Sequence, residues 1–394
     1  MVVSGFYFAT ILSPGAQNGS DFPYQIQGEQ CHLQTAGPSR FLPFVILDKR
    51  KTMHRRSFIK VAVLGFPLIA AQWNGRGIIK GKSGAIVVRG GDSRFGMPTP
   101  FKGVNPNDLK LSSKDTDGQL STFWYKGIEK TGPSFHAHPH QDEMFYVLKG
   151  TYLFRLGDEK TQLNQGDLIF LPRNLPHTWI QLSDEGELFY FLQPAGKMEE
   201  FFLEMTRTAG QLSREQAQVI GEAHGIVNHG PGLNLQEVHT TVEVLSQGFV
   251  VRASQVRKDR PNVLGGASIN YLKVAGADTG DQLSIFEYQG KKRGGPPMHV
   301  HPFQDETFYV TSGSYLFQCG DETFTLRPGD MIFLPKAVPH TWAQTTDTGQ
   351  LLFFFQPAGK MEQFFNTVGK GNFPKGYDVF KDHEMEVTGP PIAF

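Results

Sequence analysis

The chain has 394 residues, 38 basic and 38 acidic side chains, and 39% hydrophobic residues. This length and composition are typical of a globular protein with room for two domains. The balanced charge gives no electrostatic case for a nucleic-acid-binding protein. The two cysteines, Cys31 and Cys319, are too few for a four-cysteine zinc site or a disulfide framework.

Two segments precede the region of regular pattern. Residues 1–52 show no sustained periodicity, and residues 53–76 open with Met53-His54-Arg55-Arg56 before a short apolar stretch. Paired arginines before an apolar core resemble a twin-arginine export signal. We therefore expect Met53 to be the true start, residues 1–52 to be a spurious extension, and the protein to be exported to the periplasm or beyond. If residues 53–76 are instead a buried helix, the protein is cytoplasmic. The apolar stretch of about a dozen residues is too short for a stable membrane span.

From residue 84 onward, short β-branched and aromatic runs alternate with turns rich in glycine, proline and aspartate. Such runs at regular spacing predict the antiparallel strands of a sandwich or barrel. We expect strands at 85–88, which would open the first repeat, and at 119–125, 143–148, 151–155 and 168–171. Helices are expected after residues 193–199 and from Ser213, where a capping-box pattern begins.

The strand pattern and its polar residues recur without insertion or deletion. The interval is 163 residues between His136 and His299 and again between Glu143 and Glu306. An internal repeat of this kind predicts two domains of the same fold. We place the first domain and its trailing helices at 84–225, a linker at 226–240, the second domain at 241–372 and a C-terminal tail at 373–394.

Each repeat carries three histidines and a glutamate in a pattern typical of a metal site. Two histidines two positions apart point to the same face of a strand, the glutamate follows, and the third histidine opens a later strand. Three imidazoles and one carboxylate suit a divalent transition metal. The candidate ligands are His136, His138, Glu143 and His177 in the first repeat and His299, His301, Glu306 and His340 in the second.

The first repeat offers one alternative ligand. His140 lies two positions beyond His138, but its counterpart in the second repeat is Phe303. A site built from His138, His140 and Glu143 would break the register of the repeat. We therefore expect His140 to support the site or to lie on the surface.

The spacing resembles the two sequence motifs of the cupin superfamily. The matching positions are Gly132, His136, His138, Glu143, Gly150, Gly166, Pro172 and His177, followed by Gly295, His299, His301, Glu306, Gly313, Gly329, Pro335 and His340. The glycine that normally stands two positions past the proline is Asn174 or Ala337 here. The resemblance implies an all-β fold of two tandem double-stranded β-helix (jelly-roll) cupin domains, with short helices after each barrel.

Among proteins with two cupin domains, the chain most resembles the quercetinase-like group. The features are Gly-Gly-Pro-Pro at 294–297, Glu-x-Phe-Tyr-Val at 306–310, and Phe-Leu-Pro-x3-Pro-His-Thr-Trp in both repeats. This resemblance implies a metal-dependent dioxygenase that cleaves flavonol-like or other enolisable aromatic substrates with O2. Glu143 and Glu306 would then be catalytic as well as ligands, because each would accept the proton of the substrate hydroxyl.

The resemblance also implies one divalent transition metal per domain. Mn or Fe is favoured, because twin-arginine export moves proteins that have already folded around a metal; Ni, Co, Cu and Zn stay open. The alternative function is a non-catalytic metal- or ligand-binding bicupin, or a sugar isomerase-like cupin. The expected partners are a small-molecule substrate and O2, with no nucleic acid, and a homodimer is left open.

Overall fold

The structure, a computed structural model, describes residues 78–237, 241–265, 267–370 and 378–393. All of them lie within one unit of the chain, residues 69–394. The predicted spurious extension at 1–52 and the predicted export signal at 53–76 lie outside the described residues. None of the helices in the described ranges is both long enough and apolar enough to cross a bilayer.

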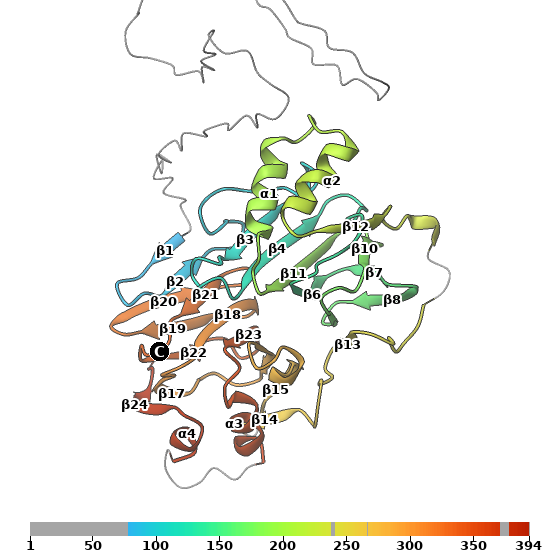
Figure 1. The fold of residues 1–394 in the computed structure, drawn as a ribbon. Coiled ribbons are helices and arrows are strands. Elements are labelled where there is room, and N and C mark those ends of the chain that lie inside the picture. The colour runs from blue at the N-terminus through green and yellow to red at the C-terminus, as the bar shows by residue number, and fades with distance from the viewer. Residues whose placement is uncertain (1–77, 238–240, 266, 371–377, 394) are drawn as a thin grey trace, which may run out of the picture. The chain divides into compact units, whose positions relative to one another are not determined.

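The first domain contains two sheets of antiparallel strands (Figure 1). In spatial order, the larger sheet contains β13 (Phe249–Val251), β9 (Leu168–Leu171), β6 (Asp142–Lys149), β11 (Gly186–Gln193), β4 (Ser121–Gly127) and β3 (Asn107–Leu111). The smaller sheet contains β12 (Val227–Gly230), β5 (Phe135–Ala137), β10 (His177–Gln181), β7 (Thr151–Leu156) and β8 (Glu159–Asn164). Strand β12 falls where we expected a linker, and it extends the smaller sheet by pairing with β5.

The second domain repeats this arrangement. Its larger sheet contains β1 (Ile78–Lys80), β2 (Ile86–Val88), β21 (Met331–Leu334), β18 (Asp305–Ser312), β23 (Gly349–Gln356), β16 (Ser284–Gly290), β15 (Ser268–Val274) and β14 (Asn262–Leu264). The smaller sheet contains β20 (Glu322–Leu326), β19 (Tyr315–Cys319), β22 (His340–Gln344), β17 (Pro297–Val300) and β24 (Glu386–Pro391). Strand β24 falls where we expected a tail, and it pairs with β17. The predicted all-β fold of two jelly-roll domains is confirmed.

Short helices follow the last long strand of each domain, as the sequence predicts. They are α1 (Met198–Arg207) and α2 (Arg214–Ala223) after β11, and α3 (Met361–Val368) and α4 (Asp378–Asp382) after β23. Helix α2 begins at a capping box, in which the Gln216 backbone N–H donates to the Ser213 hydroxyl and the Gln216 side chain accepts from the Ser213 N–H. Single 3-10 turns stand at Leu235–Glu237 and Gly276–Asp278.

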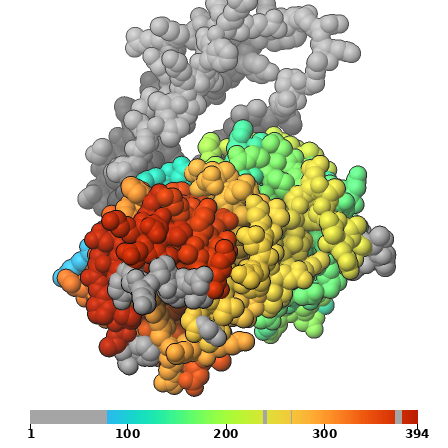
Figure 2. All heavy atoms as spheres, turned by 90° about the horizontal axis from the view of Figure 1, so that it is seen from below, coloured from blue at the N-terminus to red at the C-terminus, as the bar shows by residue number. Residues whose placement is uncertain are grey.

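The two domains exchange one strand each. Strand β2 pairs with β21 of the second domain, with Val87 opposite Ile332, and β13 pairs with β9 of the first domain, with Val250 opposite Ile169. The two exchanged strands occupy equivalent positions in the repeat, 163 residues apart. In Figure 2, yellow residues of the segment that contains β13 lie between the green and the red residues.

Our prediction that residues 85–88 open the first repeat's own sheet is therefore wrong. The physical reason is that β2 is buried on both faces. Val87 packs into the core of the second barrel, whereas Ile86 and Val88 pack into the cluster between the larger sheets. An apolar strand of this kind needs cover on both sides, and β2 obtains it at the edge of the second domain's larger sheet.

Three hydrophobic clusters hold the described residues together. One fills each barrel, and a third lies between the two larger sheets. In the third cluster, the rings of Phe189 and Tyr309 stand 4.5 Å apart between centroids. Each larger sheet thus has an inner face toward its barrel and an outer face toward the other domain, which leaves the barrel interiors as the places where polar residues need an explanation.

Candidate metal centres

Both sheets of a domain contribute to its cluster of predicted ligands. In the first domain, His136 on β5 and His177 on β10 are directly paired across the smaller sheet, and Glu143 projects from β6 of the larger sheet. His299 and His340 are paired in the same way in the second domain. All eight predicted ligands are buried, and within each set of four the candidate ligand atoms lie within 4.8 Å of one another.

The carboxylate of each cluster meets two of its histidines. Nε2 of His177 lies 3.0 Å from Oε2 of Glu143, and Nε2 of His138 lies 3.6 Å from the same oxygen. The equivalent distances in the second domain are 3.0 Å and 3.8 Å. The repeated geometry therefore brings imidazole nitrogens and a carboxylate oxygen to one point inside each barrel.

Backbone carbonyls fix the orientation of two imidazoles in each cluster. Nδ1 of His136 donates to the Ser134 carbonyl over 2.7 Å, and Nδ1 of His177 donates to the Leu175 carbonyl over 2.8 Å. The equivalent histidines of the second domain make the same bonds over 2.8 Å. Because Nδ1 carries the proton, the Nε2 lone pair faces the cluster, as in metal sites held by histidine.

The third imidazole of each cluster indicates what the clusters bind. The ring nitrogens of His138 and His301 have no hydrogen-bond partner within the described ranges, although the two side chains are only 1% and 0% exposed. Buried polar atoms without a partner are rare in folded proteins and costly to keep. A divalent cation would satisfy one nitrogen of each ring, so the residues present fit a metal at both sites.

The surroundings keep one imidazole of each cluster, His136 and His299, neutral. Burial, together with the neighbouring imidazoles, holds the pKa of His136 well below its ordinary value. Burial and the nearby His340 lower the pKa of His299 to about 3. Neutral imidazole is the form that coordinates a metal, so these two side chains are prepared for ligation at neutral pH.

The two carboxyl groups differ in their balance of effects. Burial raises the pKa of a carboxyl group, and at Glu306 burial prevails over the opposing effect of the neighbouring His340. At Glu143 burial acts in the same direction, but the neighbouring imidazoles of His138 and His177 outweigh it and hold the pKa of Glu143 below its ordinary value. The first cluster therefore favours the ionised form of its carboxyl group more strongly than the second.

A cavity adjoins each cluster. The one beside the first cluster has a volume of about 740 Å³ and extends from His136 and Glu143 to helices α1 and α2. The one beside the second cluster is smaller, about 420 Å³, and extends to α3. Their walls are largely aromatic and aliphatic: Phe145, Trp179, Met198, Phe201 and Phe202 in the first, and Phe308, Trp342, Met361, Phe364 and Phe365 in the second. Cavities with such walls suit a planar apolar molecule.

The alternative ligand of the first repeat lies apart from the cluster. His140 is exposed and does not belong to the first group of converging ligand atoms. Trp179, two residues past His177, is buried in the barrel, where its ring meets Tyr125 edge-on at 5.2 Å between centroids. It also lines the first cavity, so it belongs to the wall of the site.

The sequence analysis missed polar residues on the inner face of the larger sheet of the first domain. The Tyr190 hydroxyl donates to Oδ1 of Asn107 over 2.6 Å, and both residues line the cavity beside the ligands. The missed signal lies in the repeat itself. The residue 163 positions after Tyr190 is Phe353, so the tyrosine hydroxyl is a local departure from an otherwise shared pattern.

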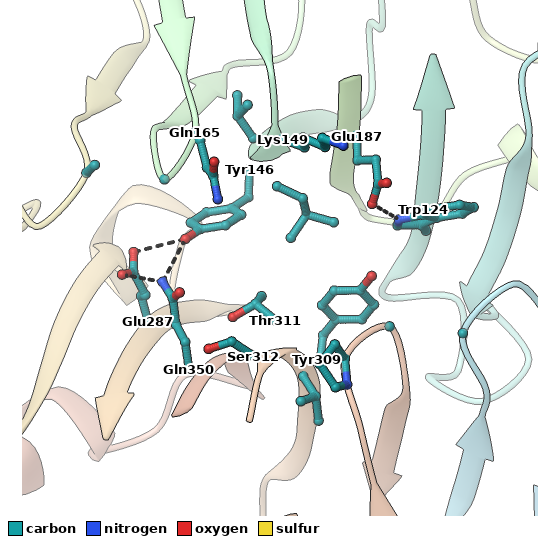
Figure 3. Close-up of a pocket in the computed structure, with 18 of the residues that line it drawn as sticks. Trp124, Tyr146, Lys149, Gln165, Glu187, Glu287, Tyr309, Thr311, Ser312 and Gln350 are labelled. Carbon is teal, nitrogen blue, oxygen red and sulfur yellow. Dashed lines mark hydrogen bonds between the residues drawn. The ribbon is translucent and has the colours of Figure 1, made fainter. Parts of the chain in front are cut away.

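A further cavity, of about 770 Å³, lies between the two domains and contains none of the predicted ligands (Figure 3). On one side Glu287 accepts hydrogen bonds from Tyr146 and Gln350 and forms a 3.1 Å ion pair with Lys273. On the other side the Trp124 indole donates to Glu187 over 3.2 Å. Of these contacts the bond from Tyr146 to Glu287 joins the two domains, and the predicted metal ligands lie in the two barrels.

Comparison with known proteins supports two cupin domains. A family model described as "Cupin domain" matches residues 127–192 and again residues 285–355. The two matched segments contain one predicted glutamate ligand each and fall in the two barrels. The chain is therefore a bicupin.

Curated relatives match only part of the chain. SchB of Streptomyces halstedii is 28% identical over 103 residues, which cover 26% of this chain and 65% of that protein. Quercetin 2,3-dioxygenase of Bacillus subtilis is 30% identical over 94 residues, which cover 24% of this chain and 28% of that protein. The chain thus matches less than two thirds of the length of either relative.

Solved structures with a similar arrangement include oxalate decarboxylases. The Bacillus subtilis enzyme at pH 4.6 is 14% identical, with a TM-score of 0.47 over 77% of this chain and 87% of that chain. The Lactobacillus farciminis enzyme in complex with formate is also 14% identical, with a TM-score of 0.48 over 69% of this chain and 86% of that chain.

Proposed function

We propose that this bicupin is a metal-dependent dioxygenase of the quercetinase type, which cleaves flavonol-like or other enolisable aromatic substrates with O2. The observation that carries the proposal is the union, in each barrel, of a three-histidine, one-glutamate cluster with a largely aromatic cavity. The partial similarity to a quercetin dioxygenase supports the same substrate class. We further propose Mn or Fe as the native metal.

The ligand set defines what the site would supply. His136, His138, Glu143 and His177 would hold the metal in the first domain, and His299, His301, Glu306 and His340 would hold it in the second. A divalent metal bound there would act as a Lewis acid and lower the pKa of a coordinated hydroxyl. The Nδ1 bonds to backbone carbonyls keep the histidines in the correct tautomer before any ligand arrives.

The glutamates would have a second role. Oε2 of Glu143 already lies within hydrogen-bonding distance of a neighbouring imidazole in a buried site. From there it can accept the proton of a substrate hydroxyl as the enolate forms, and Oε2 of Glu306 is placed in the same way. The apolar walls would stack against the substrate rings and exclude water from the reacting carbon atoms.

The direct test uses quercetin and O2. The protein is loaded with Mn, Fe, Co, Ni or Cu, its metal content is measured, and the flavonol absorbance is followed with and without oxygen. We expect oxygen-dependent bleaching with at least one metal. Glu143→Gln combined with Glu306→Gln should abolish it, because both proton acceptors are then lost.

The control variant for this test is His140→Gln, which changes an exposed histidine outside the cluster. It should leave the bleaching rate unchanged. Metal-loaded protein that bleaches no flavonol with any of the five metals would contradict the dioxygenase proposal. That result would favour the alternative functions, a non-catalytic ligand-binding bicupin or a sugar isomerase-like cupin.

A further inference from the structure

The repeat provides an internal comparison of the two cavities, because equivalent residues stand 163 positions apart. Most of the inner face is shared, including Asn107 with Asn270 and Tyr125 with Tyr288. Among the equivalent positions that line both cavities from the central strands of the larger sheets, one differs in chemistry, Tyr190 against Phe353. This difference determines which hydrogen bonds the neighbouring polar side chains can make.

In the first cavity, two buried polar groups are left without a partner. Tyr190 donates its hydroxyl to Oδ1 of Asn107 and so holds the amide, which leaves Nδ2 of Asn107 unpaired among the described residues. The Tyr125 hydroxyl, which stands on the neighbouring strand opposite Asn107, is also unpaired within the same described part of the chain. The Asn107 and Tyr125 side chains are 1% and 2% exposed and both line the cavity.

These groups lie on the same face of the larger sheet as the metal-ligating glutamate. Strand β6 carries Glu143 and β11 carries Tyr190, while β4 and β3 carry Tyr125 and Asn107, and these four strands are consecutive in the sheet. All four residues line the one cavity. A ligand oxygen placed at the cluster would therefore leave room for a second ligand oxygen farther along the sheet.

The second cavity lacks this arrangement. Phe353 offers no hydroxyl, and the Tyr288 hydroxyl is already satisfied by Oγ of Ser268 at 3.0 Å. Asn270 presents an unpaired Oδ1, and no tyrosine orients its amide among the described neighbours. The cavity is also smaller, about 420 Å³ against about 740 Å³. The second site is therefore suited to a smaller ring system and offers it one unpaired acceptor, Oδ1 of Asn270.

We infer that the first site selects a hydroxylated aromatic substrate, with Tyr125 and Asn107 as specificity-determining residues and Tyr190 as the residue that positions Asn107. The second site, with the single unpaired acceptor Oδ1 of Asn270 in a smaller cavity, makes this selection more weakly. The inference rests on the proposed function for the class of substrate. A site built to pair with a ligand hydroxyl rejects the analogue that lacks it, because its own polar groups then stay unpaired.

The test compares quercetin with 3-hydroxyflavone, which lacks the distal hydroxyls. Binding is measured without oxygen by flavonol absorbance and fluorescence on Mn-loaded protein, so turnover is not the readout. His299→Ala with His340→Ala leaves only the first metal site, and His136→Ala with His177→Ala leaves only the second. We expect the first site to bind quercetin about tenfold more tightly than 3-hydroxyflavone, and the second site to show a smaller preference.

Matched variants then separate the residues. Tyr125→Phe and Asn107→Leu should each weaken quercetin binding at the first site by about three- to tenfold and leave 3-hydroxyflavone binding unchanged. Tyr190→Phe, which copies the second repeat, should have a smaller effect of the same kind. Phe353→Tyr is the reciprocal variant, because it gives the second site the tyrosine that the first site has at the equivalent position. Melting temperature and metal content confirm that each variant is folded and loaded. The comparison of quercetin with 3-hydroxyflavone on protein that retains Tyr125 does not depend on these variants.

The outcomes distinguish this inference from the proposed function. Equal affinities of the first site for both ligands, or a quercetin preference that survives Tyr125→Phe and Asn107→Leu, would overturn the inference even if quercetin is bleached. The expected preference without any oxygen-dependent bleaching would support the selective site and overturn the dioxygenase proposal.

Discussion

At the scale of the residue, the two clusters are sets of side chains that fit a divalent cation. His138 and His301 are fully enclosed, and the described residues leave their ring nitrogens without a partner. The other imidazoles are already oriented by backbone carbonyls. The fold therefore positions the candidate ligands in advance, and it leaves the rings of His138 and His301 without a hydrogen bond among the described residues. Metal binding should therefore be tight and should depend on each cluster separately.

The first prediction concerns metal stoichiometry. Wild-type protein should bind two equivalents of divalent metal, and His138→Ala or His301→Ala should each reduce this to one, because each change removes an imidazole from a single cluster. The double variant should bind none. Inductively coupled plasma mass spectrometry after gel filtration measures the content. Retention of both equivalents in either single variant would show that the metal sits elsewhere.

The ligand residues could be predicted from the sequence, and the specificity residues could not. Residues two apart on a strand share a face, and the repeat fixes which of several histidines belong together, which is why His140 could be set aside. Tyr190 differs from its counterpart Phe353, but an aromatic residue within Gly186–Gln193 is typical of an ordinary strand core, so the difference alone does not indicate a role. Only the neighbouring strands bring Asn107 to its hydroxyl, and strand order is not encoded in local periodicity.

At the scale of the element, β2 and β13 show how stability is shared between the halves of the chain. Each is only three residues long, and each pairs with a strand from the other repeat. A destabilising substitution in one exchanged strand should therefore lower the stability of the domain with which that strand pairs.

The second prediction tests this exchange. Val87 is fully buried in the core of the second barrel, so Val87→Ala should destabilise that region by about 2 kcal/mol. Hydrogen exchange followed by mass spectrometry should show roughly 30-fold faster exchange in β21, the strand that β2 pairs with. Faster exchange confined to β9 would mean that β2 belongs to the first domain after all.

Val250→Ala on β13 provides the matched variant, because Val250 stands opposite Ile169 of β9. It should speed exchange in β9 and leave β21 unchanged. The sequence could not predict either pairing. A run such as Ile86-Val87-Val88 indicates burial on both faces, but both larger sheets offer an apolar edge, and the choice between them depends on how the domains meet.

At the scale of the whole molecule, the interface between the domains buries two lysines at equivalent positions with different partners. Lys273 forms an ion pair with Glu287. At the position equivalent to Glu287 the first repeat has Trp124, and Nζ of Lys110 lies 5.7 Å from the centroid of its ring. The Lys110 ammonium donates to the carbonyl oxygens of Arg89 and Asp92. Burial lowers the pKa of Lys110 to about 8. The folded protein therefore holds a costly charge at neutral pH.

The third prediction follows from the sign of this shift. Between about pH 8, where native Lys110 loses its proton, and the ordinary value of 10.5, the unfolded state binds more protons, so stability rises with pH. Over this window wild-type protein should gain about 3 kcal/mol relative to Lys110→Met. Urea unfolding of both proteins from neutral to alkaline pH measures the difference.

Lys381→Met, which changes an exposed lysine, is the control for that comparison, and its difference from wild type should not vary with pH. A constant difference for Lys110→Met as well would mean that the native lysine keeps its proton throughout.

The fourth prediction concerns the other buried lysine. Glu287→Gln would leave Lys273 as an uncompensated charge between the domains, so it should destabilise the protein by about 3–5 kcal/mol. Lys273→Met together with Glu287→Gln should recover much of that loss, because the double change removes both charges. Thermal unfolding of the single and double variants gives the coupling. Equal destabilisation by the two variants would show that the pair itself is not the source.

The exchange of β2 and β13 between the domains also has a consequence for a chain with a single copy of the repeat. An ancestor with a single copy of the repeat would have had no second half from which to receive this strand. It would have completed its larger sheet only by pairing with a strand from a second copy of the same molecule. The contact inside the present protein thus has the form of a two-fold contact between identical molecules.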